Sequence, residues 1–409
     1  MYQEITRCRI SGSTNLVNVL SLGEQYLTGV FPSSRDQLVT KGPVDMVWCP
    51  DSGLVQMKQS YSLDEMYGDN YGYRSGLNQS MVNHLQNKVN MLLRKVDTRP
   101  GDIILDIGSN DATSLKCYPS SLRRIGIDPT GKKFSEFYTD DISLVPDFFT
   151  AANFRKIFPN EKARIVTSIA MFYDLEDPVQ FASDIESVLA EDGIWHFEQS
   201  YLPSMFRTNS YDTICQEHLE YYSLISVKYI LEKAGLRIQD IELNDINGGS
   251  FAVTAVKKNA ALPSNEAVIS WMLEEEIKMG LNTEKPYREF AERVAAHRDS
   301  LINLLDKLKN DGKKIIGYGA STKGNVLLQY CGIDTRYLDA IAEVNEQKFG
   351  SFTPGTLIPI ISEAEAKAMK PDYLFVLPWH FRNNILGREK EYRASGGKFI
   401  FPLPFIEIV

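Results

Sequence analysis

Apolar runs alternate with segments of helical periodicity through the middle of the 409-residue chain. The runs predict four strands, at residues 103–107, 124–127, 164–168 and 193–197. This alternation is typical of parallel strands joined by crossover helices. Two further strands, at 237–244 and 250–256, are separated by Asn247, Gly248 and Gly249, and so short a connection requires an antiparallel pair. The pattern therefore predicts a parallel sheet that closes with an antiparallel hairpin, within residues 76–258.

The regions on either side of this sheet have different patterns. Residues 1–75 are rich in turn formers and predict a small irregular module with two short strands, at 45–48 and 53–57. Apolar residues at helical spacing predict bridging helices at 271–281 and 287–308, within residues 259–310. Strands at 314–318, 338–343 and 373–377 and a helix at 325–331 predict a second, smaller α/β domain over residues 311–409.

Composition and charge narrow the class of protein. Hydrophobic residues are 43% and charged residues 24%, which are values of an ordered globular chain. The net charge of −9 argues against a nucleic-acid partner. We expect no membrane partner, because no apolar run approaches the ~18 residues of a transmembrane helix. The absence of a signal-peptide pattern and the five widely spaced cysteines favour the reducing cytoplasm.

A glycine-containing turn follows the predicted strand at 103–107. Gly108 allows a ligand to approach the backbone closely. Asp128 follows the next strand, where a carboxylate can accept both ribose hydroxyls of a nucleoside. Phe148 follows a third stretch and offers a ring to adenine. The ordered set predicts a nucleoside site with the candidate residues Asp106, Gly108, Asn110, Asp111, Asp128, Asp147, Phe148 and Tyr173.

NAD and S-adenosylmethionine (SAM) compete for this predicted site. A dinucleotide site needs a G-x-G-x-x-G turn, in which pyrophosphate lies at the helix N-terminus. Here the turn reads GSNDAT and carries an acid where pyrophosphate would lie. Acidic side chains suit the cationic amine and sulfonium of SAM. The antiparallel terminal hairpin is also typical of class I methyltransferases, so the sequence favours SAM.

The densest polar cluster is YDTICQEHLEYY at residues 211–222. It follows the strand at 193–197, at the sheet edge where open α/β sheets bind ligands. His218 beside a carboxylate can act as a general base near neutral pH, although a structural hydrogen-bond cluster is the alternative. Of the other histidines, we expect His84 and His297 at the surface and His196 in the core.

Several separated motifs resemble those of one known family. They are CRISG at 8–12, CPDSGLVQ at 49–56, YGDNYGYRS at 67–75, LDIGSND at 105–111, EHLEYYS at 217–223, GYGASTKGN at 317–325, and KPDY and LPWHF at 370–381. The chain resembles, over essentially its whole length, the sugar C-methyltransferases that act on nucleotide-linked ketodeoxysugars. The resemblance implies a class I methyltransferase domain with a Rossmann-like fold, a zinc-ribbon-like N-terminal module and a second Rossmann-like domain for the sugar nucleotide.

The resemblance also implies roles for individual residues. His218 would remove the proton beside the keto group, Glu217 would orient it, and Tyr71, Tyr73 and Tyr222 would lie near the sugar. An enolate would then take the methyl group of SAM. The loop at 317–325 would hold the diphosphate. The candidate substrate-binding residues are Gly319, Ser321, Lys323, Asn325, Trp379 and His380.

The chain departs from the family pattern at two kinds of position. The family binds zinc through two Cys-x-x-Cys pairs, but here Ser11 and Ser52 replace the second cysteine of each pair. Serine is a poor zinc ligand, so we expect weak or absent zinc, with Cys8 and Cys49 as ligands if the metal is bound. Near the proposed base, Cys215 and Tyr173 stand where relatives place other polar groups.

Three alternatives to sugar C-methylation remain open from sequence. The same base could direct the methyl group to a hydroxyl oxygen. A non-catalytic relative could bind SAM or sugar nucleotide without turnover. A dehydrogenase with two nucleotide folds is disfavoured by the acidic first turn.

Overall fold

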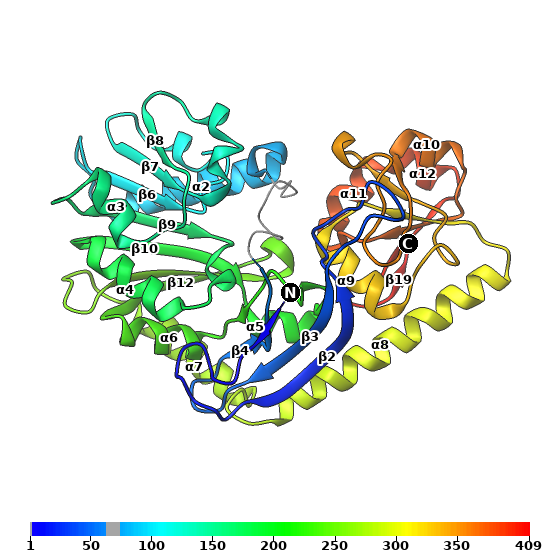
Figure 1. Cartoon of the computed structure of the whole chain (residues 1–409), viewed down its shortest axis with the longest axis horizontal. Coiled ribbons are helices and arrows are strands. Elements are labelled where there is room, and N and C mark those ends of the chain that lie inside the picture. Colours follow the sequence, from blue (N-terminus) through cyan, green and yellow to red (C-terminus); the bar gives the residue numbers. More distant parts are fainter. Residues whose placement is uncertain (1, 63–73) are drawn as a thin grey trace.

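The computed structural model describes residues 2–62 and 74–409. Two α/β units lie side by side, and long N-terminal strands together with helix α8 (Lys285–Asn310) run along the base between them (Figure 1). One continuous apolar cluster joins the N-terminal strands, α8 and the C-terminal unit, with Met46, Phe290 and Ile315 among its buried members. Within the described ranges, no helix is long and apolar enough to cross a membrane.

The first unit is built on a seven-stranded sheet of order β12-β13-β10-β9-β6-β7-β8. Six of these strands were predicted from the sequence, and the seventh, β8, is the stretch that ends just before Asp147. Their bounds are β6 (Ile103–Ile107), β7 (Arg123–Ile127), β8 (Ile142–Val145), β9 (Ala163–Ile169), β10 (Leu189–Ser200), β12 (Leu236–Asn244) and β13 (Ser250–Lys257). β13 pairs antiparallel with both β10 and β12, whereas the other pairings are parallel. The predicted closing hairpin is therefore confirmed.

Local sequence explains how this unit forms. All five residues of β6 are buried, as expected for a central parallel strand. Helix α4 (Pro178–Val188) begins with proline at its first turn and with Asp177 as N-cap. Ser223 and Ser226 form a reciprocal capping box on α6 (Leu224–Lys233). The remaining helices of the unit are α2 (Gln79–Lys95), α3 (Ala151–Ile157) and α5 (Leu202–Thr208).

The N-terminal module is more regular than we expected from its sequence. Three strands, β2 (Val17–Tyr26), β3 (Lys41–Trp48) and β4 (Val55–Met57), form an antiparallel sheet. The fourth strand, β11 (Glu220–Tyr221), comes from the histidine-containing cluster of the first unit. Strand β2 is not among the strands predicted from the sequence. Two register shifts against β3 break the alternation of buried and exposed residues along this strand. Two short strands, β1 (Gln3–Glu4) and β5 (Gln59–Ser60), pair separately.

Two helices connect the units. α7 (Glu266–Lys278) begins five residues before its predicted start, and α8 extends over 26 residues. α8 buries one face, which includes Tyr287, Phe290 and Leu301, against β2 and α9 (Thr322–Cys331). The predicted bridging helices are therefore confirmed as helices, and their packing ties the three regions together.

The C-terminal unit contains a six-stranded sheet of order β16-β15-β14-β17-β18-β19. The strands are β14 (Ile315–Tyr318), β15 (Ile341–Glu343), β16 (Ile360–Ser362), β17 (Tyr373–Val376), β18 (Lys398–Phe401) and β19 (Glu407–Ile408), and only β19 pairs antiparallel. The accompanying helices are α10 (Glu363–Ala368), α11 (Arg382–Arg388) and α12 (Lys390–Ala394). The glycine loop follows the central strand β14, as the first glycine turn follows β6.

Candidate active site

A cavity of about 1150 Å³ lies between the two α/β units. One side is lined by residues at the carboxyl ends of β6, β7, β9 and β10, and the other side by the loop after β14. Ligands of open α/β sheets bind at this edge. The candidate residues that line it are Asp106, Gly108, Asn110, Asp128, Phe148, Tyr173, Glu217, His218, Gly319, Ser321 and Lys323.

The glycine turn after β6 is shaped by backbone geometry. Gly108 has a φ of +69°, and a Cβ there would lie 3.0 Å from Met171 Cγ. Asn110 also has a positive φ, and its backbone N–H donates to Asp128 Oδ2 at 2.7 Å. This bond joins the turn to the end of β7. The arrangement keeps the backbone open to a ligand.

Asp106 is buried at the end of β6. Thr167 Oγ1 donates to Asp106 Oδ1 at 2.5 Å. Burial raises the pKa of Asp106 to about 7, against the effect of the Thr167 hydrogen bond. A cationic ligand would favour its ionised form.

The residues on this side of the cavity fit SAM. Besides Glu217, seven carboxyl groups of the first unit line it, namely Asp106, Asp128, Asp174, Glu176, Asp177, Asp184 and Glu198. Their negative charge suits a ligand with an amine and a sulfonium. The open turn at Gly108 and the exposed ring of Phe148 suit a nucleoside.

His218 is held by the backbone of its own cluster. Its Nδ1 lies 2.8 Å from the Thr213 carbonyl oxygen, and its ring meets Tyr173 edge-on at 4.5 Å between centroids. A carbonyl only accepts, so Nδ1 carries the proton and the Nε2 lone pair remains available. Burial lowers the pKa of His218 to about 4, and the nearby Lys323 lowers it further in the same direction. The ring is therefore a neutral base at pH 7.

Glu217 lies at the same cavity, but among the described residues it makes no hydrogen bond to His218. The ring of His218 is oriented by the hydrogen bond that Nδ1 donates to the Thr213 carbonyl. We had predicted that Glu217 would orient this ring, and the structure corrects that prediction. Glu217 Oε1 packs so closely against Gly29 that a side chain there would clash. Burial raises the pKa of Glu217 to about 7. It is a group that can exchange a proton near neutral pH.

The second glycine loop, at residues 317–325, places Lys323 on the opposite side of the cavity. Gly319 has a φ of +83°, and a Cβ there would lie 2.7 Å from Pro378. Ser321 caps α9 by accepting from Gly324 N at 3.0 Å. Lys323 Nζ donates to the Asn247 carbonyl at 3.2 Å, and burial lowers the pKa of this lysine although Asp212 opposes the effect.

Three more residues at this side were missed by sequence reasoning. Lys348 Nζ donates to the Ala320 carbonyl at 2.7 Å. Arg388 donates to Tyr318 and pairs with Glu363. Glu343, at the end of β15, accepts from Ala320 N at 2.8 Å, much as Asp128 accepts from Asn110 N.

The sequence features that could have predicted these three residues differ in strength. Glu343 ends a predicted strand beside the strand that carries the glycine loop, and this pattern could have revealed it. Lys348 and Arg388 carry no local motif. Their place beside the loop follows only from the packing of the C-terminal unit.

Other candidate residues lie away from the cavity lining. Tyr222 is fully buried and donates to the Phe172 carbonyl at 3.3 Å. Asn325 is fully buried and donates to the Thr28 carbonyl at 2.8 Å, while Trp379 donates to Asp212 at 2.8 Å. Asp111, Asp147 and His380 are also absent from the lining. Tyr71 and Tyr73 lie outside the described residues.

Two histidine predictions are wrong and one is confirmed. His84 bonds Glu198, and His297 lies between Tyr211 and the Pro402 carbonyl, so neither is a free surface residue. Both helices bury the face that carries the histidine, which the periodicity of α2 and α8 did not reveal. His196 is in the core, as expected.

The predicted metal residues form two equivalent turns. Gly12 N donates to the Cys8 carbonyl and Gly53 N to the Cys49 carbonyl, both at 2.8 Å. Cys8 Sγ lies 3.3 Å from Ser52 Oγ, and Cys49 Sγ lies 3.5 Å from Ser11 Oγ. Two thiols and two neutral hydroxyls do not fit a structural zinc ion. Among the described residues, no group of three or more His, Cys, Asp or Glu side chains is placed to hold a metal.

The fold and the site define a class I SAM-dependent methyltransferase. Family models match a methyltransferase domain at residues 81–241, a C-methyltransferase C-terminal domain at 245–404 and a zinc-binding domain at 8–67. C-methyltransferase NovU of Streptomyces niveus is 31% identical over 98% of this chain and 96% of its own length. The chain therefore belongs to this C-methyltransferase family.

Two solved methyltransferase structures are each similar to less than half of this chain. Magnesium protoporphyrin IX methyltransferase of Synechocystis PCC 6803, with bound S-adenosylhomocysteine (SAH), is 14% identical, with a TM-score of 0.34 over 47% of this chain and 90% of its own. The CcbJ methyltransferase of Streptomyces caelestis is 9% identical, with a TM-score of 0.33 over 42% of this chain and 89% of its own.

Proposed function

We propose that this enzyme methylates the carbon beside the keto group of a nucleotide-linked ketodeoxysugar. The observation that carries the proposal is the separation of charge across the cavity. The first unit lines one side with carboxyl groups and Arg74, whereas the C-terminal unit lines the other with Lys323, Lys348 and Arg388 beside Glu343 and Glu363, the second of which pairs with Arg388. The acidic side suits the cationic methyl donor, and the basic side suits a diphosphate.

The chemistry begins with proton removal by His218. A keto group acidifies the hydrogen on the neighbouring carbon, and the neutral Nε2 of His218 takes this proton. SAM supplies an electrophilic methyl group when bound. The enolate carbon would form the new bond to that methyl as the methyl–sulfur bond breaks and SAH leaves, and the proton would stay on the imidazole until it passes to Glu217 or to solvent. A positioned base of this kind contributes about 10²–10⁴ in rate.

Other cavity residues support this assignment. Lys323 lies near enough to His218 to disfavour its protonated form, which keeps the base neutral. The same ammonium can stabilise negative charge that develops on the substrate. Glu217, with its raised pKa, can accept the proton from His218 or pass it to solvent.

All five cysteines are unpaired, which supports the expected cytoplasmic location.

A mass-spectrometric assay in heavy water tests the function. The protein is incubated with SAM and a panel of nucleotide-4-ketodeoxyhexoses. We expect a gain of about 14 Da on one sugar nucleotide, SAH as co-product, and deuterium at the carbon beside the ketone when SAM is omitted. Methylation on oxygen without such exchange would instead favour an O-methyltransferase. SAH binding with no turnover on any sugar would contradict the proposal.

His218→Asn tests the base within the same assay. We expect kcat to fall by about 10²–10⁴, together with the deuterium exchange, because both need proton removal. The affinity for SAH should change little, since the methyl donor binds at the acidic side. Turnover within a few-fold of the wild type would show that another group is the base.

A further inference from the structure

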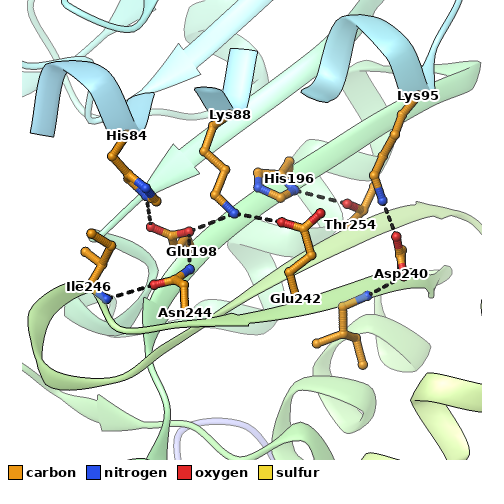
Figure 2. A network of polar contacts seen from close by, with 11 residues as sticks. His84, Lys88, Lys95, His196, Glu198, Asp240, Glu242, Asn244, Ile246 and Thr254 are labelled. Atoms are coloured by element: carbon orange, nitrogen blue, oxygen red, sulfur yellow. Dashed lines mark hydrogen bonds and ion pairs between the residues drawn. The ribbon is translucent and has the colours of Figure 1, made fainter. Parts of the chain in front are cut away.

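Helix α2 is fastened to the sheet by three basic side chains that lie outside the proposed chemistry. Figure 2 shows His84, Lys88 and Lys95 pointing from α2 toward acids on β10 and β12. Lys95 pairs with Asp240 at the far end of the helix, and Lys88 Nζ lies 3.0 Å from Glu242 Oε2. The end of α2 nearest the cavity is held at Glu198.

Glu198 is the point where these contacts meet. His84 Nε2 lies 2.5 Å from Glu198 Oε1, and Lys88 Nζ lies 2.9 Å from Glu198 Oε2. Asn244 Nδ2 donates to the same Oε2 at 2.8 Å (Figure 2). Burial of Glu198 opposes its ionisation, but His84 and Lys88 outweigh this and lower its pKa to about 2. Glu198 is therefore a fixed, ionised anchor.

The helix fastened in this way forms part of the cofactor side of the cavity. Met81 and Leu85 of α2 line it, as does Glu198. The 3₁₀ turn η1 (Ser75–Leu77), just before α2, contacts the first glycine loop: Ser75 N donates to Asn110 Oδ1 and Gly76 N to Asp111 Oδ2, both at 3.0 Å. The position of α2 consequently affects the loop expected to contact SAM.

We propose that His84 and Glu198 are positioning residues for the methyl donor. They hold α2, and through it η1, against the glycine loop in the arrangement that binds SAM. This inference concerns the donor alone, so it does not depend on the identity of the sugar.

The contacts at the two ends of α2 supply a matched comparison. His84→Leu removes a donor to Glu198 near the cavity, and Lys95→Met removes a pair at the far end of the same helix. His84→Gln keeps a donor that can reach Glu198. SAH binding by calorimetry and thermal unfolding are measured for each variant, followed by KM for SAM and kcat.

We expect His84→Leu to weaken SAH binding about tenfold and to raise the KM for SAM more than it lowers kcat. His84→Gln should restore affinity to within about threefold. Lys95→Met should lower the melting temperature while leaving SAH affinity within about twofold. Equal losses of affinity in His84→Leu and Lys95→Met would show a purely structural helix contact and overturn the proposal. So would unchanged SAH binding in His84→Leu.

The variant Glu198→Gln tests whether Glu198 acts through His84 or by direct contact with the methyl donor. It also replaces His84→Leu as the test if that variant fails to fold. We expect it to weaken SAH binding about tenfold. If Glu198 acts through His84, the double variant with His84→Leu should bind SAH no more weakly than Glu198→Gln alone. Fully additive losses, or normal SAH binding by Glu198→Gln, would overturn the proposal.

Discussion

At the scale of single residues, the environment of His218 sets its chemistry. The hydrogen bond to Thr213 fixes the tautomer, and burial fixes the charge. A free histidine has a pKa near 6.5. Here the pKa is lowered to about 4, so the ring is neutral above about pH 6 and gains its proton only as the pH falls through the lowered value.

We expect an NMR titration of the histidine rings to show no protonation of His218 between about pH 6 and pH 8. The signal is assigned with His218→Asn. Lys323→Met should raise the pKa of His218 by less than about one unit, because the charge is removed while the larger effect, burial, remains. A midpoint near 6.5 in both proteins would show a solvated ring and contradict the assignment.

Gly108 carries a second prediction at this scale. Gly108→Ala places a Cβ near Met171 in the left-handed region, at a conformational cost of about 1–2 kcal/mol. We expect SAH affinity to fall about tenfold, because the turn must shift. Gly101→Ala is the control, since Gly101 also has a positive φ but nothing lies within 4 Å of its added Cβ. Calorimetry on both should give a loss of SAH affinity in Gly108→Ala alone.

At the scale of elements, the N-terminal sheet explains how the chain can fold with an altered zinc motif. β11 joins β4, so the N-terminal strands are continued by a strand from the histidine-containing cluster. Trp48 of β3 stacks on Tyr287 of α8 at 4.7 Å between centroids. Burial of this apolar surface supplies stability that small zinc modules draw from metal.

The two Cys-x-x-Ser turns yield a prediction about metal binding. We expect the purified protein to contain far less than one zinc per chain and to keep its melting temperature in a chelator. Ser11→Cys with Ser52→Cys should supply four thiolates and bind about one zinc per chain, because the two turns already face each other. Elemental analysis measures both proteins. One tightly held zinc in the wild type would contradict this expectation.

At the scale of the whole molecule, the candidate active site is lined by both α/β units. The first supplies most of the acids, Arg74 and His218, and the second supplies Lys323, Lys348 and Arg388 together with Glu343 and Glu363. Lys323 contacts the hairpin turn of the first unit through Asn247, so the two halves meet at the cavity itself. The apolar cluster shared by β3, α8 and β14 packs the regions together around it.

Because the acidic side chains of the first unit and the basic side chains of the C-terminal unit lie on opposite sides of the cavity, we expect a substitution on the basic side to weaken the binding of one ligand and not the other. Lys348→Met should weaken binding of a nucleoside diphosphate about tenfold, or about 1.4 kcal/mol, while leaving SAH binding unchanged. Lys348 lies beside the second glycine loop, at 4.3 Å from the ring centroid of Phe31. Lys390→Met, at an exposed position in the same unit, is the control. Calorimetry with both ligands measures the effect, and equal weakening of both would contradict separate binding sides.

The sequence by itself determined the order of the main elements and the class of enzyme. Buried parallel strands are continuous apolar runs, and the Asn-Gly-Gly connection requires a hairpin, so both features are local. The glycine turn, Asp128 and His218 likewise lie at strand ends or in motifs that the sequence exposes.

Only the tertiary structure decided which side chains meet. β2 was missed because register shifts interrupt its alternation. Thr213 rather than Glu217 orients His218, and Glu198 fastens a helix more than a hundred residues earlier in the chain. Lys348 and Arg388 carry no motif at all. Burial, charge and hydrogen-bond partners depend on how distant segments pack, and this packing is set by the shared core rather than by any local pattern.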